Sequence, residues 1–150
     1  MKQGTYTLLL VLEKEASIAV GRLGTFTFPA GHYIYVGSAQ GGLDTRVKRH
    51  LKSEKRLRWH IDYLLESARV VEVWHALGDE SQECLWCQVA QGMPQSEIPV
   101  PGFGSSDCRC PSHLVYFPSR PSFQLFRRRL KDKGEGVKRA LPAEFLSAAS

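Results

Sequence analysis

HYIYV, at residues 32–36, is the strongest strand signal in the sequence, and Gly37 and Ser38 follow it directly. β-Branched and aromatic side chains pack well on a pleated sheet, and the turn signal Pro29-Ala30-Gly31 marks where this strand begins. Residues 4–12, GTYTLLLVL, have a similar composition and predict a second strand. Two shorter strands are expected between them, at residues 17–20 and 25–28, which would make an antiparallel meander.

A helix is predicted directly after this β-structure, because Leu43, Val47 and Leu51 recur at every fourth residue. Further helices are expected at 57–67 (with Trp59 in the core), 80–91 and 123–130, further strands at 70–74 and 113–117, and a long Pro- and Gly-containing loop at 92–112. The expected fold class is α/β of the α+β kind, a small and mostly antiparallel sheet flanked by helices. A chain of 150 residues fits one such domain, expected over residues 1–131, with a flexible tail at 132–150.

Positive charge is unevenly distributed along the chain. Lys and Arg outnumber Asp and Glu by 20 to 15, and residues 46–58 hold seven of these cations against one acid, Glu54. Such a cluster favours a polyanionic partner; the alternative is a solvated helix face. A second cluster lies at 127–133. The residues expected to contact nucleic acid are Lys48, Arg49, Lys52, Lys55, Arg56 and Arg58.

The N-terminal sequence bears on location. The longest apolar stretch, residues 7–12, is too short to span a bilayer, and the first ten residues do not have the organisation of a signal peptide. A cytoplasmic protein that does not engage a membrane is therefore expected.

Two short motifs resemble a known signature. Gly4-Thr5-Tyr6 and Tyr35-Val36-Gly37 are similar to the two halves of the GIY-YIG nuclease signature. Arg46, with His50 four residues later on the same helix face, resembles the catalytic-arginine helix of those nucleases, and Glu83 begins a helix where they place a single metal-binding glutamate. The chain resembles most closely the GIY-YIG-related family DUF123, which is sometimes fused to endonuclease III-type repair glycosylases. The stretches that carry this resemblance run in order from Gly4 to His113: VGRLG, PAGHYIYVGSA, RVKRH, RWHIDYLL, EC, GFGSSDCRC and SHL.

The resemblance implies a GIY-YIG-like fold and a Mg²⁺- or Mn²⁺-dependent endonuclease that acts on DNA, in repair and in association with repair enzymes. Glu83 would hold the metal, because Mg²⁺ uses few protein carboxylates and keeps several waters. Arg46 would neutralise charge on the phosphate. Tyr6 or Tyr35 would orient or deprotonate water, with His50 as proton acceptor; the resemblance favours Tyr6. His60 is expected beside the site or on a phosphate.

Each of these residues has a structural alternative. The tyrosines could be packing residues of a sheet, Arg46 and His50 members of a solvated basic helix, and Glu83 an acid favoured by the helix dipole. The chain also departs from the signature, since it contains no asparagine, whereas GIY-YIG nucleases carry one late in the domain, and it inserts an extra hairpin at residues 17–29. The second functional hypothesis is therefore a nucleic-acid-binding module without catalysis.

The four cysteines form two close pairs, Cys84-x₂-Cys87 and Cys108-x-Cys110, and His113 follows them. In a cytosolic chain, this spacing favours zinc over disulfides. Two ligand sets are compatible with a tetrahedral site: the four cysteines, or Cys84, Cys108, Cys110 and His113. The alternative is four reduced thiols.

Overall fold

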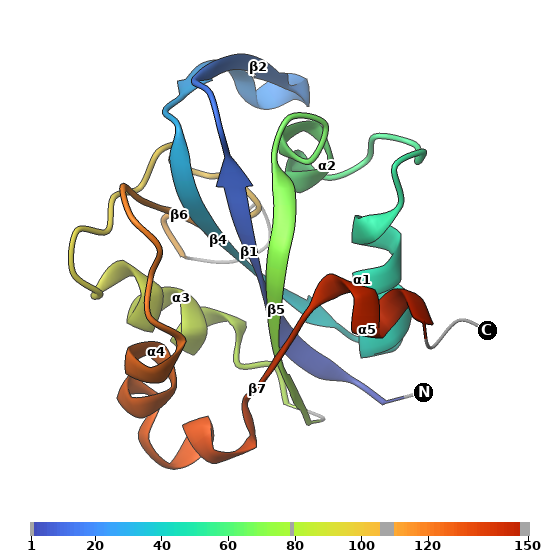
Figure 1. Cartoon of the computed structure of the whole chain (residues 1–150), viewed down its shortest axis with the longest axis vertical. Helices are drawn as coiled ribbons and strands as arrows, with labels where there is room; N and C mark the ends of the chain where they lie inside the picture. The colour runs from blue at the N-terminus through green and yellow to red at the C-terminus, as the bar shows by residue number, and fades with distance from the viewer. Residues whose placement is uncertain (1, 79, 106–109, 148–150) are drawn as a thin grey trace.

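A five-stranded antiparallel sheet forms the centre of the computed structural model, which describes residues 2–78, 80–105 and 110–147 (Figure 1). β1 (Gly4–Leu12) is the middle strand, with β4 (Gly31–Ala39) on one side and β5 (Arg69–Leu77) on the other. β6 (Leu114–Phe117) extends the sheet beyond β4, and β7 (Lys138–Ala140) extends it beyond β5. The predicted fold class, a mostly antiparallel sheet flanked by helices, is confirmed.

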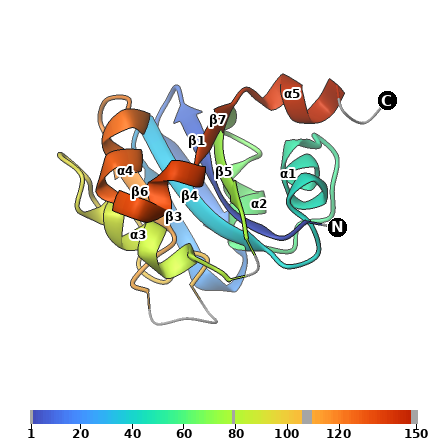
Figure 2. The same cartoon turned by 90° about the horizontal axis from the view of Figure 1, so that it is seen from below.

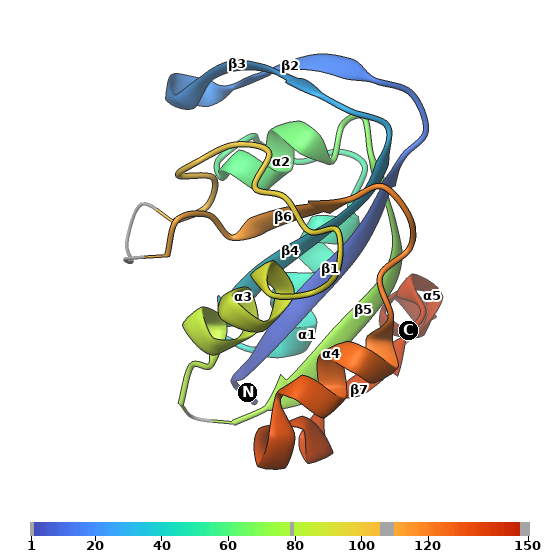
Figure 3. The ribbon, with the colours of Figure 1, turned by 90° about the vertical axis from the view of Figure 1, so that its left-hand side faces the viewer.

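Both faces of the sheet are covered. α1 (Leu43–Leu51), α2 (His60–Leu64) and α5 (Pro142–Ser147) pack on one face, and α3 (Glu83–Gln91) and α4 (Phe123–Arg129) pack on the other, as Figures 2 and 3 show. The apolar run of β1 follows from this arrangement, because Leu8 and Leu10 face the first core and Leu9 faces the second. All three leucines are fully buried.

The N-terminal strands do not form the predicted meander. β1 pairs with β4, and β2 (Ala16–Val20) and β3 (Gly24–Phe28) pair with each other in a separate two-stranded sheet, joined through the short 3₁₀ turn Gly21–Leu23. β1 and β4 are apolar on both sides and suit the centre of the sheet. β2 and β3 alternate buried or half-buried with exposed residues, so they suit a hairpin with one solvated face.

Helix α2 is shorter than the predicted helix at 57–67. The carboxylate of Asp62 accepts hydrogen bonds from the backbone N–H groups of Arg58 and Trp59, at 2.9 and 2.8 Å. Trp59 is therefore held in an extended conformation, and the helix begins only at His60.

The C-terminal segment also differs from its sequence prediction. The sequence predicts a flexible tail at residues 132–150, whereas the described residues of this segment contribute to a 3₁₀ helix (Lys131–Gly136), strand β7 and helix α5. Ala140 and Phe145 are buried in the core on the α1 face. Only a few apolar residues of this segment pack in the core, and they lie among many polar ones. The hydrophobic periodicity that would predict a helix or strand is therefore weak. Among the described residues, no helix has the length and apolar character needed to cross a membrane.

Candidate functional site

Tyr6 and Tyr35 lie on the same face of the sheet, on adjacent strands. In the antiparallel register Tyr6 is opposite Gly37, and Leu8 is opposite Tyr35, so the two tyrosines form a diagonal pair. The phenol of Tyr6 lies across β4 above Gly37. A Cβ atom at position 37 would come within 2.5 Å of Tyr6 Oη, which is closer than real contacts allow. Glycine at position 37 is therefore what allows Tyr6 to occupy this place.

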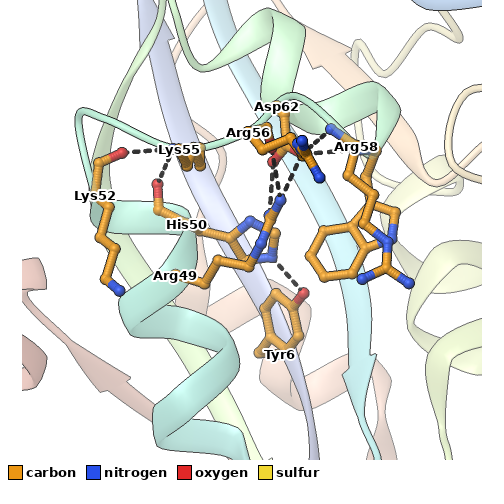
Figure 4. Close-up of polar contacts among 9 residues, drawn as sticks. Tyr6, Arg49, His50, Lys52, Lys55, Arg56, Arg58 and Asp62 are labelled. Atoms are coloured by element: carbon orange, nitrogen blue, oxygen red, sulfur yellow. Dashed lines mark hydrogen bonds and ion pairs between the residues drawn. The ribbon is translucent and has the colours of Figure 1, made fainter.

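Helix α1 brings two more of the predicted residues to this face. His50 Nε2 and Tyr6 Oη form a buried hydrogen bond of 2.7 Å (Figure 4). Arg46, one turn earlier, donates from Nη1 to the carbonyl of Ser38 at the end of β4, at 3.2 Å. The predicted i, i+4 relation of Arg46 and His50 thus places both side chains beside the tyrosines.

A cavity of about 220 Å³ opens where these elements meet. Tyr6, Tyr35, Arg46 and Glu83 all line it, so four of the five residues predicted for catalysis and metal binding converge there. His50 is 2% exposed and lies behind Tyr6. The other described residues that line it are Gly37, Ser38, Arg58, Trp59, His60 and Gly104. A larger cavity of about 660 Å³ lies near the start of α1 and the end of β5, and none of the predicted catalytic or metal-binding residues lines it.

The charge states of the buried pair follow from its environment. Burial raises the pKa of Tyr6 well above its usual value; Glu83 acts in the same direction, and the neighbouring Arg46 opposes it. Burial also raises the pKa of Tyr35. Burial lowers the pKa of His50 to about 3. At neutral pH the protein therefore holds neutral phenols beside a neutral imidazole.

Trp59, for which the sequence predicts a core position, is a half-buried platform for three arginines. The guanidinium carbons of Arg49, Arg46 and Arg58 lie 4.0, 4.6 and 5.5 Å from the centre of its ring. Trp59 also lines the cavity, so it holds cations at the cavity wall. Sequence reasoning missed this role, because periodicity marks Trp59 only as apolar.

Asp62 fixes the segment that follows α1 (Figure 4). Its carboxylate is fully buried and forms a bidentate ion pair with Arg49, at 2.8 and 2.9 Å. Burial raises the pKa of Asp62, but the hydrogen bonds from Arg49 and from the backbone N–H groups of Trp59 and Arg58 outweigh it and hold the pKa below its usual value. The aspartate is therefore charged and tied to three neighbours.

The residues predicted to contact nucleic acid divide into two groups. Arg49 is bound to Asp62, and Lys55 Nζ donates to the carbonyls of His50 and Lys52, so both hold the protein's own structure (Figure 4). The other four, Lys48, Lys52, Arg56 and Arg58, are exposed or half-exposed. They form the accessible part of the predicted basic surface.

A cluster of sulfur and imidazole ligands lies next to Glu83. One ligand atom each from Cys87, Cys110 and His113 falls within 4.8 Å of the others, so this cluster could hold a metal ion. Cys84 Sγ lies 3.1 Å from Cys110 Sγ. Cys87 therefore joins three of the residues in the predicted mixed ligand set; the fourth of that set, Cys108, lies outside the described residues.

The cysteine cluster and the cavity are physically linked. Glu83 is the first residue of α3, and Cys84 and Cys87 follow on its first turns. His113 Nδ1 lies 3.6 Å from Glu83 Oε2. Glu83, which is 25% exposed, thus lies between the cavity and the cluster.

Comparison with known proteins gives one match. No curated protein and no solved structure matches the chain. Residues 5–134 match the family described as "Domain of unknown function DUF123", and this region includes every residue that lines the cavity and every cysteine. The match covers most of the 150 residues, and the protein therefore belongs to the DUF123 family.

Proposed function

We propose that this protein is a metal-dependent endonuclease that hydrolyses phosphodiester bonds of DNA in the cavity lined by Tyr6, Arg46 and Glu83. The observation that carries the proposal is the convergence of these three residues in one cavity, with His50 hydrogen-bonded to Tyr6 behind it. The arrangement brings together a hydrogen-bonded phenol and imidazole, a permanent cation and a carboxylate, and these groups can relay a proton from water, neutralise charge on a phosphate and hold a metal. The resemblance of the two tyrosine motifs to the GIY-YIG signature supports the same reaction.

The proton path runs through Tyr6. Water in the cavity gives a proton to Tyr6 Oη as the phenol passes its own proton to His50 Nε2, 2.7 Å away. The hydroxide attacks phosphorus, and the bond from phosphorus to the leaving oxygen breaks. Arg46 neutralises the negative charge that grows on a non-bridging oxygen. Tyr6 is the tyrosine that is hydrogen-bonded to His50, which favours it over Tyr35 as the base.

The donors in the cavity fit Mg²⁺ or Mn²⁺. Glu83 is the one carboxylate among the described residues that line it, and the other oxygen donors are phenols, a serine and backbone carbonyls. A hard divalent cation accepts this set, because it keeps most of its waters. When bound by Glu83, such a cation would withdraw charge from the phosphate and help the leaving oxygen depart.

The test is Glu83→Gln, with Glu80→Gln as a matched control that removes the same charge from an exposed residue outside the cavity. We expect Glu83→Gln to reduce Mg²⁺-dependent cleavage at least about 100-fold on a panel of branched, nicked and abasic DNAs, while DNA affinity changes less than about threefold. Glu80→Gln should cleave like wild type. Equal cleavage by the Glu83→Gln variant and wild type would remove Glu83 from the mechanism.

The second candidate function is a DNA-binding module without catalysis. The absence of asparagine favours it, because the GIY-YIG signature includes an amide that this chain cannot supply from Asn. The two functions differ in one measurement: a binding module retains DNA affinity but cleaves no member of the panel with Mg²⁺ or Mn²⁺. For either function, we propose a setting in DNA repair with repair enzymes as partners, which rests on the resemblance alone.

For the cysteine cluster, we propose a structural zinc ion held by Cys84, Cys87, Cys110 and His113. Three thiolates and one imidazole are a common closed tetrahedral set for zinc. The close approach of Cys84 to Cys110, within a cluster that already gathers Cys87 and His113, supports this set. Such an ion would join the start of α3 to His113, which directly precedes β6, and would thereby hold Glu83 in position.

Metal analysis of the purified protein tests the zinc site. We expect about one zinc per chain, absent from Cys87→Ser and retained in Cys108→Ser, which removes the same thiol chemistry from outside this set. Removal of zinc from wild type by a chelator should lower the melting temperature. If Cys108→Ser loses zinc and Cys87→Ser retains it, the zinc ligands include Cys108 and not Cys87. An absence of zinc in wild type, with a Cys84–Cys110 disulfide found by mass spectrometry, would overturn the proposal.

A further inference from the structure

His60 lies at the cavity wall and is held there by a defined hydrogen bond. It is the first residue of α2, and it lines the cavity with Tyr6, Arg46 and Glu83. The backbone N–H of Gly104 donates a hydrogen bond to His60 Nδ1 at 2.8 Å. This bond joins two segments that are 44 residues apart in the sequence.

The hydrogen bond from Gly104 determines which ring nitrogen of His60 carries the proton. A backbone N–H can only donate, so Nδ1 must present its lone pair. Burial lowers the pKa of His60, which keeps the ring neutral at physiological pH. The single ring proton is therefore on Nε2, and His60 offers the cavity a neutral N–H donor in place of a base.

The backbone that carries His60 and the imidazole ring itself are both held in place. The start of α2 is fixed by Asp62, which accepts from the backbone N–H groups of Arg58 and Trp59. The imidazole also lies against the ring of Phe103, with centroids 5.6 Å apart. A side chain held this way needs little reorganisation to donate to a ligand.

We propose that His60 Nε2–H donates a hydrogen bond to a non-bridging phosphate oxygen of the bound phosphodiester. The inference rests on the proposed endonuclease function and adds a substrate-contacting residue to it. The cavity walls carry the guanidinium groups of Arg46 and Arg58 and one carboxylate, so the ligand expected near His60 is an anion. A neutral N–H orients a phosphate oxygen without adding charge, which separates the role of His60 from that of Arg46.

Two isosteric substitutions separate this role from a structural one. The carboxamide of asparagine overlays His Nδ1, so His60→Asn keeps an acceptor for Gly104 but has no Nε2 donor. The carboxamide of glutamine overlays Nε2, so His60→Gln keeps a donor to the phosphate but has no acceptor for Gly104. We expect His60→Asn to lower kcat/KM for DNA cleavage by about 10- to 100-fold, the range for a hydrogen bond to a charged group. His60→Gln should reduce it by less than about tenfold, and the control His75→Asn, outside this cavity, should cleave like wild type.

The ring nitrogens can be observed directly, even without cleavage. In the free protein, ¹⁵N-resolved NMR of the histidine side chains should show His60 protonated on Nε2. Addition of a short DNA duplex in a buffer without Mg²⁺ or Mn²⁺ should shift the Nε2 resonance of His60, and the Asn variant should bind this duplex more weakly than the Gln variant. If wild type cleaves no DNA but these shifts occur, the endonuclease proposal fails and the phosphate contact stands. If His60 carries its proton on Nδ1, if DNA that binds leaves its Nε2 unshifted, or if the Asn variant matches wild type, the inference about His60 is overturned.

Discussion

At the scale of single residues, burial keeps Tyr6 and His50 of the site in their neutral forms. Tyr6 and His50 share a hydrogen bond in the core, with the pKa of the phenol raised and that of the imidazole lowered. Both groups are therefore neutral in the free protein, and positive charge near Tyr6 Oη lowers the pKa of the phenol. Arg46 acts in this direction, whereas the carboxylate of Glu83 raises the pKa of Tyr6.

The lowered pKa of His50 predicts a specific acid sensitivity of the fold. The unfolded chain takes up a proton on this residue below about pH 6.5, whereas the folded protein does so only near pH 3. Between these values the unfolded state binds more protons, so stability falls as the pH falls, by up to about 1.4 kcal/mol per pH unit from this group. Denaturant unfolding of wild type and His50→Gln from about pH 7 to about pH 4 measures it. The variant, which cannot titrate there, should have a flatter profile; parallel profiles would contradict the assignment.

Single residues also show where sequence reasoning stops. The helical spacing of Arg46 and His50 placed them on one face, because periodicity is local. The hydrogen bond between His60 and Gly104 and the gathering of arginines around Trp59 join segments that only the tertiary fold brings together. Glu83 was predicted from the family resemblance alone, since nothing in the pattern of α3 separates a ligand from an ordinary first-turn acid.

At the scale of elements, an ion pair with a fully buried carboxylate anchors the connection between α1 and α2. Asp62, fully buried, accepts from Arg49 on α1 and from two backbone N–H groups that precede α2. The ion pair positions the backbone of Trp59 and His60 at the cavity wall, so the geometry of the site depends on this pair. Local helix propensity suggested a longer α2 and did not indicate where the chain must stay extended.

We expect Asp62→Asn to lower the free energy of unfolding by about 3 kcal/mol, because it leaves Arg49 without its buried anion. The control is Glu13→Gln, which breaks the ion pair with Arg69 on the surface, where both side chains are mostly exposed. That change should cost less than about 1 kcal/mol. Chemical denaturation of the two variants gives the comparison, and a similar small loss for both would show that the α1–α2 connection does not depend on Asp62.

At the scale of the whole molecule, the sheet separates two basic clusters. α1 and the segment after it lie on the face of the sheet that carries Tyr6, and α4 with its arginines lies on the opposite face (Figure 2). The sequence alone could not distinguish the two clusters, since both are short runs of basic residues. Their positions in the fold distinguish them, because only the first cluster adjoins the cavity, through Arg46 and Arg58.

DNA that enters the cavity should therefore bind on the α1 side. We expect replacement of Lys48, Lys52 and Arg56 by alanine to flatten the dependence of log affinity on log salt by about 0.9 for each phosphate that is no longer neutralised, or up to about 3 in all. The matched control replaces Arg128, Lys131 and Lys133, which removes the same charge from the far side of the sheet. Its salt slope should stay near that of wild type, because net charge acts only weakly beyond a Debye length of about 8 Å at physiological salt.

Fluorescence anisotropy with one labelled duplex, titrated between about 50 and about 200 mM salt, compares wild type with both variants. The α1-side variant alone should have the flatter slope, since we expect the phosphates of DNA bound at the cavity to lie against Lys48, Lys52 and Arg56. A slope that falls only in the control variant would place the DNA on the α4 face, away from Tyr6 and Glu83, and would separate DNA binding from the cavity altogether.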